Sequence, residues 1–196
     1  MITVLTDIRQ AVSDTEVIEW LRLPQGACSA SEVNVINTLA HSGTIALEER
    51  LKRKMLHAEV LKEAKDWSPI MGLPWSPFVE LIEFTYKDED GNIQSVDPDL
   101  YEILERDLPA RINFFDNVKD LPELHKKSTY PIQIKYKVGE AETADTVPQN
   151  YKQVILMAVA SGYMNRASLS SKTLQTEAME HYINQVLRNK RVMRFG

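Results

Sequence analysis

The sequence predicts an α+β protein: a small helical bundle with an antiparallel β-rich subregion inserted between its second helix and a helix that begins at Pro148. Two observations support this class. Apolar residues recur at helical spacing behind helix-start signals in the first and last parts of the chain. The middle instead carries short alternating segments, which prolines and turn residues separate. The 196 residues suffice for one domain, or for one domain with an insertion.

Two capping boxes predict the starts of the first two helices. In such a box a serine side chain accepts a hydrogen bond from the backbone N–H three residues on, and a glutamate at that position bonds back. The boxes are Ser13-Asp14-Thr15-Glu16 and Ser29-Ala30-Ser31-Glu32. Apolar residues follow each box at helical spacing, and Pro24 ends the first segment. We expect helices at about 14–23 and 31–50, with Trp20 in the core.

The β-rich insertion is expected over about residues 54–139. Its beginning, Lys52–Asp66, is ambiguous, because the composition favours helix whereas alternation of residue types at its centre favours strand. From Trp67 onward a series of prolines forbids helix. Trp67 and Trp75 flank this proline-rich loop. They anchor either the core or a subunit interface, and the sequence does not separate these two roles.

Alternation then predicts a series of strands. A half-buried strand is expected where apolar side chains alternate with more polar ones, at Phe78, Ile82, Phe84 and Tyr86. The acidic sequence Asp88-Glu89-Asp90-Gly91-Asn92 supplies a turn, because Gly91 can take a positive φ. The chain should return antiparallel over Ile93–Val96. Further strand candidates are Tyr101–Leu104, Arg111–Phe115 and Ile132–Val138.

The clearest helix in the sequence runs from about Pro148 to Arg166. Proline suits the first turn of a helix, where the backbone N–H has no partner to lose. An apolar stripe follows, made of Tyr151, Val154, Ile155, Met157, Ala158, Val159, Gly162 and Tyr163. Glycine lowers helix stability by about 1 kcal/mol relative to alanine. We therefore interpret Gly162 as a point of close helix packing, where another backbone approaches. A last helix is expected at about 171–190.

The charge distribution separates an acidic body from a basic C-terminal tail. The formal net charge is −5, which argues against a dedicated nucleic-acid-binding protein. The last nine residues contain four basic side chains and no acidic one, which leaves −9 on the rest of the chain. We therefore divide the sequence into a domain at residues 1–187 and a tail at residues 188–196. The tail either docks onto an acidic partner or is a solubilising helix end.

A search for catalytic and ligand-binding motifs is mostly negative. The four histidines never take the spacing that places two metal ligands on one helix face, and there is no phosphate loop or nucleophile elbow. The acidic turn resembles a calcium loop, but Ile93 stands where that loop needs glycine. Other metal-site candidates are Asp97, Asp99, Glu102, Glu105 and Asp107. We interpret these as solvated charges, and we expect no catalytic residue, no metal and no cofactor.

The sequence also bears on the compartment. A single cysteine, Cys28, cannot form an internal disulfide, in agreement with a reducing environment. No apolar run reaches the ~20 residues that a membrane span needs. The start of the chain lacks the pattern of a signal peptide. We expect folding in a cytoplasm and no membrane contact.

Three motifs follow one another in a fixed order. They are the strand Pro77-Phe78-Val79-x-Leu81-Ile82-x-Phe84-x-Tyr86, the turn Asp88-x-Asp90-Gly91, and the helix that begins Val147-Pro148 and ends Tyr163-Met164-Asn165-Arg166. This ordered set, within about Ser13 to Ala167, resembles the head–tail connector (adaptor) proteins of tailed bacteriophages and phage-like gene transfer agents. The resemblance favours strand at Lys52–Asp66. One departure is Gly139–Ala144, which is short and acidic where relatives often carry glycine-rich sequence.

The resemblance implies a structural role in the virion and no enzymatic activity. In that family many copies, typically twelve, form a ring beneath the portal, extend the DNA channel and offer a platform for the stopper or the tail. The implied partners are the portal protein, stopper or tail proteins, and further copies of the chain, with passive contact to DNA. The implied location is the head–tail interface, after assembly in the host cytoplasm. The implied portal-binding residues are Arg188, Lys190, Arg191, Met193, Arg194 and Phe195.

Two alternatives remain open at the level of sequence. Another phage structural protein, such as a tail-completion protein, has a similar composition. A small metal-dependent nuclease or hydrolase would instead use the carboxylates of residues 88–107. Stoichiometric binding of a divalent metal would favour the second alternative.

Overall fold

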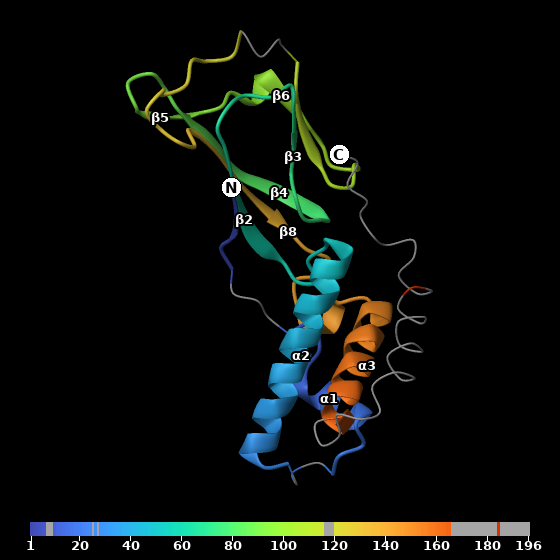
Figure 1. Ribbon diagram of the computed structural model, residues 1–196. Coiled ribbons are helices and arrows are strands. Elements are labelled where there is room, and N and C mark those ends of the chain that lie inside the picture. The colour runs from blue at the N-terminus through green and yellow to red at the C-terminus, as the bar shows by residue number, and fades with distance from the viewer. Residues whose placement is uncertain (7–9, 25, 27, 116–119, 166–183, 185–196) are drawn as a thin grey trace. The chain divides into compact units, whose positions relative to one another are not determined.

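The computed structural model describes residues 1–6, 10–24, 26, 28–115, 120–165 and 184 (Figure 1). Contacts between residues divide the chain into two compact units. The β unit comprises the described residues within 1–7 and 57–139, and the helical unit comprises those within 8–56 and 140–191. Antiparallel strands thus lie between two helices of the helical unit in the sequence, which confirms the predicted α+β class.

The helical unit contains α1 (Asp14–Trp20), α2 (Ala30–Leu51), the short 3-10 helix η3 (Ala144–Thr146) and α3 (Gln149–Asn165). Both capping boxes form as predicted: the backbone N–H groups of Glu16 and Glu32 donate to the serine hydroxyl oxygens at 3.2 and 3.3 Å. α2 ends because Lys52 adopts a left-handed conformation with φ of 55°. No helix within the described residues is long and apolar enough to cross a membrane.

The core of the helical unit lies between α2 and α3. The stripe predicted on the last of these helices supplies Ile155 and Val159, both fully buried, and α2 contributes Ile36 and Ala40. Burying a large apolar side chain contributes about 1.5–3 kcal/mol. Several such side chains outweigh the ~1 kcal/mol that the glycine in α3 takes away. Packing therefore determines that this segment is helical.

Trp20 does not lie in the core, so the sequence prediction for this residue is wrong. It is the last residue of α1, which has only seven residues, and its side chain is 45% exposed. A helix this short buries one narrow stripe. Val17 occupies that stripe, and Ile18 and Leu21 pack against the core beside it. Trp20 is left at the surface.

Two glycines lie where α2 and α3 pack together. A Cβ atom added to Gly43 would lie 3.7 Å from the carbonyl oxygen of Ile155, so the backbone of α3 passes close to this point of α2. A Cβ atom added to Gly162 would lie 2.7 Å from Leu39 Cδ2. Gly162 therefore faces a leucine side chain, and the close backbone approach that the sequence suggested for it is found at Gly43.

The β unit consists of two antiparallel sheets (Figure 1). The five-stranded sheet has the order β1 (Ile2–Val4), β2 (Ala58–Ala64), β8 (Ile132–Val138), β4 (Phe78–Lys87), β5 (Ile93–Ser95). The three-stranded sheet has the order β3 (Ile70–Gly72), β7 (Arg111–Phe114), β6 (Tyr101–Leu104), with a short 3-10 helix, η1 (Pro98–Leu100), before β6. The predicted strands at 93–96, 101–104, 111–115 and 132–138 are confirmed to within one residue. β1 and β3 were not predicted.

The ambiguous segment Lys52–Asp66 contains a strand. β2 pairs with β8 along its whole length, from Ala58 opposite Val138 to Ala64 opposite Ile132. The buried side chains of β8 alternate with partly exposed ones, as in a strand with one face on the core. The alternation in the sequence therefore predicted this segment better than its helix-favouring composition did.

Two β-bulges in β4 change which of its side chains point inward. The pairing of β4 with β8 shifts register between Phe78 and Glu80, and again between Leu81 and Glu83. Each extra residue reverses the alternation of faces. Leu81 therefore packs against the core, while Ile82 is 42% exposed. The prediction that Ile82 lies on the buried side of this strand is wrong for this reason.

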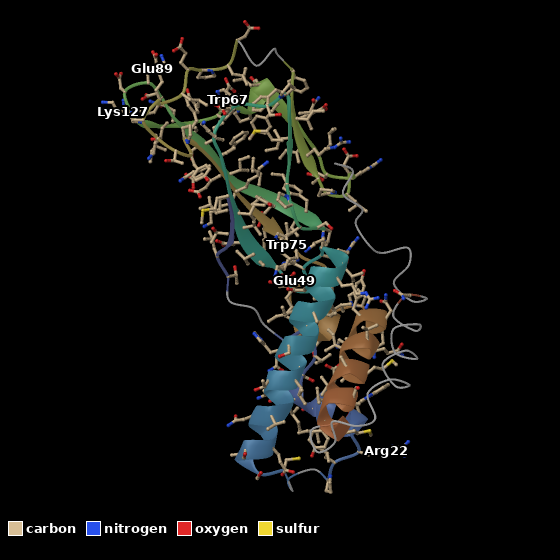
Figure 2. The ribbon with its side chains drawn as sticks, viewed as in Figure 1. Arg22, Glu49, Trp67, Trp75, Glu89 and Lys127 are labelled. Carbon is tan, nitrogen blue, oxygen red and sulfur yellow. The ribbon has the colours of Figure 1, made fainter. Side chains whose placement is uncertain are left out.

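Trp67 is partly buried and packs against the core of the β unit (Figure 2). Its ring packs edge-on against three other aromatic rings, with centroid distances of 6.2, 5.6 and 5.5 Å to Phe84, Tyr86 and Phe114. Its indole N–H donates to the carbonyl oxygen of Pro122 at 2.8 Å. The contacts give Trp67 a place in the core, one of the two roles that the sequence left open. Trp75 also packs, partly buried, against this core.

Candidate functional site

The residues predicted to bind the portal lie outside the described residues. They are Arg188, Lys190, Arg191, Met193, Arg194 and Phe195. The helix expected at 171–190 lies outside them as well, apart from Asn184. That residue accepts a hydrogen bond from Arg50 Nη2 at 2.7 Å. The binding role of the tail therefore stays a prediction.

The acidic sequence after β4 is a hairpin turn built on Asp88. Its carboxylate accepts from the backbone N–H of Asn92 at 2.8 Å and from Gln94 Nε2 at 3.0 Å. These hydrogen bonds, foremost the one from Gln94, hold the pKa of Asp88 below its usual value of 3.8. Gly91 has a φ of 89°, as the turn requires. The predicted turn is confirmed, and local bonds occupy the carboxylate that a calcium loop would place on the ion.

Glu89 lies at the end of this hairpin (Figure 2). The neighbouring Glu123 carboxyl raises the pKa of Glu89, first through a hydrogen bond and then through its charge. These two side chains line an open hollow together with Asp88, Asp90 and Pro122. Two acidic side chains therefore lie close together in this hollow.

Three of the carboxylates at residues 97–107 have a structural partner. Asp97 accepts from the backbone N–H of Asp99 at 3.0 Å. Glu102 accepts from Asn113 Nδ2 at 2.9 Å, and Asp107 forms an ion pair with Arg111 at 2.7 Å. Within the part of the chain that the structure describes, no group of three or more His, Cys, Asp or Glu side chains could hold a metal ion. The acidic residues do not come together as a nuclease site would require.

The helical unit buries charged groups that the sequence did not single out. Glu48 and Lys54 form an ion pair at 2.7 Å with side chains only 6% and 7% exposed. The other oxygen of this glutamate accepts from the backbone N–H of Met55 at 2.9 Å. The pair thus holds the chain directly after α2 against the helix that precedes it.

A second buried group lies beside it. Arg53 pairs with Glu140 at 2.6 Å, and the hydroxyl of Tyr151 donates to the same carboxylate at 3.4 Å. Burial, followed by the charge of Glu140, raises the pKa of Tyr151 to about 12. A third pair joins α1 to α3, from Lys152 to Glu16 at 2.6 Å. In the pairs Arg53–Glu140 and Glu16–Lys152 the partners are far apart in the sequence, so no local sequence motif predicts them.

Exposed apolar side chains lie on both edge strands of the five-stranded sheet. On the β1 side Met1, Ile2 and Leu5 are all exposed. On the β5 side Ile93 is 67% exposed. Exposed apolar groups beside an unpaired sheet edge are suited to contact with another chain. These edges are the candidate interaction surfaces of the β unit.

Neither a family model nor a curated protein matches the sequence. Solved structures do resemble its fold. A chain of the virion of a native gene transfer agent (GTA) particle superposes with a TM-score of 0.75 and 16% identity. Chains from the neck of an empty GTA particle, computed with C6 symmetry, and from the neck of a native one, computed with C12 symmetry, give TM-scores of 0.74 and 0.66 at 17% and 15% identity.

Each comparison covers 100% of this chain and 97% of the other. The likeness is one of fold. Because it extends over all of this chain and nearly all of the other, it includes both the helical unit and the β unit. A protein that shared only one common motif, such as a helix pair, would not be matched in this way.

Proposed function

We propose that this chain is a structural protein of the neck of a phage-like particle, and that it acts there as a head–tail connector. The observation that carries the proposal is the full-length likeness of fold to a GTA neck chain, at a TM-score of 0.74. The ordered strand, turn and helix motifs in the sequence support it independently. In this role the chain needs no cofactor and performs no reaction.

The connector assembles as a ring beneath the portal and extends the DNA channel towards the stopper or the tail. The similar necks were computed with C6 and C12 symmetry, which supports a ring of twelve copies. The chain outside the basic tail carries −9, so a ring of many copies has a strongly negative field. Acidic residues that line the channel repel DNA, so the DNA slides past the ring without binding it.

The basic tail docks the ring onto the portal. The charges of the segment 188–196 steer the encounter, and Met193 and Phe195 anchor the bound tail. Deletion of residues 188–196 should abolish portal binding and leave the melting temperature of the described units unchanged. Portal binding that survives the deletion would contradict this role of the tail.

The proposal is tested by electron microscopy of the purified chain, alone and mixed with its portal protein. A ring stacked coaxially on the portal is the expected result. Some connectors form their ring only when the portal is present. The mixed sample therefore decides whether the proposal holds. A chain that stays monomeric on intact portal rings, or that binds the side of the portal, would overturn the proposal.

A further inference from the structure

The outer edge of β1 carries unpaired backbone groups. Met1 and Glu63 exchange backbone hydrogen bonds at 2.8 and 2.9 Å, and the N–H of Leu5 donates to Glu59 at 2.8 Å. Odd-numbered residues of this segment therefore face β2. In an antiparallel pair the residues between them turn away from the partner strand. Ile2 and Val4 thus direct their N–H and C=O groups to the outside of the sheet, beyond which no described strand lies.

Apart from the short length of β1, this edge lacks the devices that prevent edge-to-edge pairing. Soluble proteins protect edge strands with lysine, proline, a bulge or an inward charge. The segment Met1-Ile2-Thr3-Val4-Leu5-Thr6 contains no charged side chain and no proline, and its register with β2 is regular. Leu5 is 47% exposed beside the open edge. An edge of this composition is suited to accept another strand.

The opposite edge of the same sheet is equally open. The N–H of Val96 donates to Phe84 at 2.9 Å, and the N–H of Asp88 donates to Asn92 at 3.0 Å. Even-numbered residues of β5 therefore face β4, and Ile93 and Ser95 direct their backbone groups outward. All three residues of β5 are exposed, and none is charged. Nothing among the described residues buries this strand.

The two edges are compatible with each other. Neighbouring strands of the sheet are antiparallel throughout, so β1 and β5, at its two ends, run in the same direction. A second copy placed beside the first in the same orientation brings its β5 parallel to β1. Residues that lie opposite each other on neighbouring strands point to the same face of a sheet. Leu5 lies opposite Glu59 of β2 and Ile93 opposite Lys87 of β4, and these two partners share one face, so Leu5 and Ile93 share it as well. Leu5 lies level with Lys137 of β8, whereas Ile93 lies level with Pro131. A new apolar pair therefore forms across the contact when the second copy is shifted along the strands by the six residues from 131 to 137.

We propose that β1 of one copy pairs with β5 of the next, so that the five-stranded sheets of adjacent copies join edge to edge. The partner is another copy of this chain, because each chain offers both halves of the contact. A contact between two different patches repeats from copy to copy and forms a ring when its rotation closes. The inference rests on the proposed ring and assigns its subunit contact, the seam, to two short strands.

Proline substitutions at the seam remove one outward N–H without touching the bonds inside the sheet. Val4→Pro and Ser95→Pro are compared with Val4→Thr and Ser95→Thr, which keep that N–H. Mass photometry over a concentration series, with and without portal, measures the fraction of chains in rings. Each proline should raise the concentration for half-assembly about tenfold relative to its threonine control, as expected for one hydrogen bond lost at every seam.

A charge exchange identifies the strand that β1 meets. Leu5→Lys combined with Ile93→Lys should prevent ring formation, because two ammonium groups then face each other across the seam. Leu5→Lys combined with Ile93→Glu should restore rings in low salt. The two double variants differ only at residue 93, so a general loss of folding cannot explain rings that return in one of them. Circular dichroism melts of both double variants check that they are equally folded.

The outcomes separate the seam from the proposed function. Rings that form equally well in the proline variants and in both charge doubles overturn the seam and leave the connector role intact. Rings lost equally in both charge doubles, which melt alike, also overturn it. A wild-type chain that forms no ring even with portal overturns the connector role, and the seam falls with it.

Discussion

The β unit and the helical unit place their charges in opposite ways. In the β unit the ion pairs lie at the surface, as in Lys135 with Glu59 and Lys137 with Glu80, and aromatic rings fill the interior. In the helical unit the pair of Glu48 and Lys54 is almost completely buried. Exposed pairs contribute roughly 0–1 kcal/mol to the free energy of unfolding. Removing one partner of a buried pair costs more, because the other charge stays unpaired in the low-dielectric interior. The two units should therefore respond differently to loss of charge and to loss of volume.

The largest effect is expected from Glu48→Ala. It removes the carboxylate from a buried ammonium group and from the backbone N–H of Met55. The expected loss of unfolding free energy is about 3–5 kcal/mol. Urea unfolding measures it, with Glu49→Ala as the control, since Glu49 pairs with Lys52 at the surface and should lose less than about 1 kcal/mol. Equal losses in the two variants would contradict the burial of the Glu48–Lys54 pair in the helical unit.

The corresponding volume change in the β unit is Trp67→Ala. It leaves a cavity among three aromatic rings and an unpaired carbonyl oxygen at Pro122. We expect a loss of about 3–5 kcal/mol, chiefly from the cavity. The control is Trp20→Ala in α1, at an exposed site, with an expected loss below about 1 kcal/mol. Thermal unfolding measures the loss of stability in each variant. A larger loss for Trp20→Ala than for Trp67→Ala would overturn the assignment of the core.

A smaller effect is expected from Gly162→Leu, which tests packing in the helical unit without changing charge. The larger side chain meets Leu39 in α2, and overpacking costs about 1–3 kcal/mol. Gly162→Ala is the informative comparison. Leu39 Cδ2 is the end of a movable side chain, so moving it costs little. This cost should nearly cancel the gain in helix stability that alanine brings over glycine. A melting temperature unchanged by leucine would show that the two helices have spare room here.

The smallest effect is a pH dependence that arises from Glu16. Burial works against the charged form, but the hydrogen bond from Lys152 and those from Ser13 prevail and lower the pKa of Glu16 below its usual 4.5. A depressed pKa in the folded state contributes stability above 4.5, which is lost as the pH falls through the folded-state pKa. Glu16→Gln should flatten stability against pH in this acid range. An unchanged slope would show that the pair with Lys152 does not form in solution.

Local rules predicted the parts of the fold that are determined locally. Both capping boxes lie where Ser13 and Ser29 indicated, and Gly91 takes the predicted positive φ. Strands of four or more residues were found because alternation needs several residues to be visible. β1 and β3, with three residues each, are too short to show it, whereas the equally short β5 was predicted from the turn that precedes it. Their pairing partners, and not their own sequence, make them strands.

Errors arose where residues distant in the sequence decide the outcome. The bulges in β4 reverse the side of Ile82, and their position depends on the pairing with β8. Trp20 was placed in the core, but Val17, Ile18 and Leu21 form the face of this segment that packs there, and Trp20 lies on the other side. The buried pair of Arg53 and Glu140 joins residues on either side of the β unit. The predicted tail site lies outside the described residues, and the sheet edges became visible only through the strand order.

The pairing of β2 with β8 has a consequence for how the chain folds. α2 and α3 pack together although the whole β unit lies between them in the sequence. The ladder begins with Ala58 opposite Val138 and so brings the two ends of the insertion together. Once it forms, the loop that must close for helix packing is roughly sixfold shorter, and the free-energy cost of closing it falls by about 1.5 kcal/mol. The β unit should therefore fold first. α2 and α3 should then pack together after their chain ends have already been brought close.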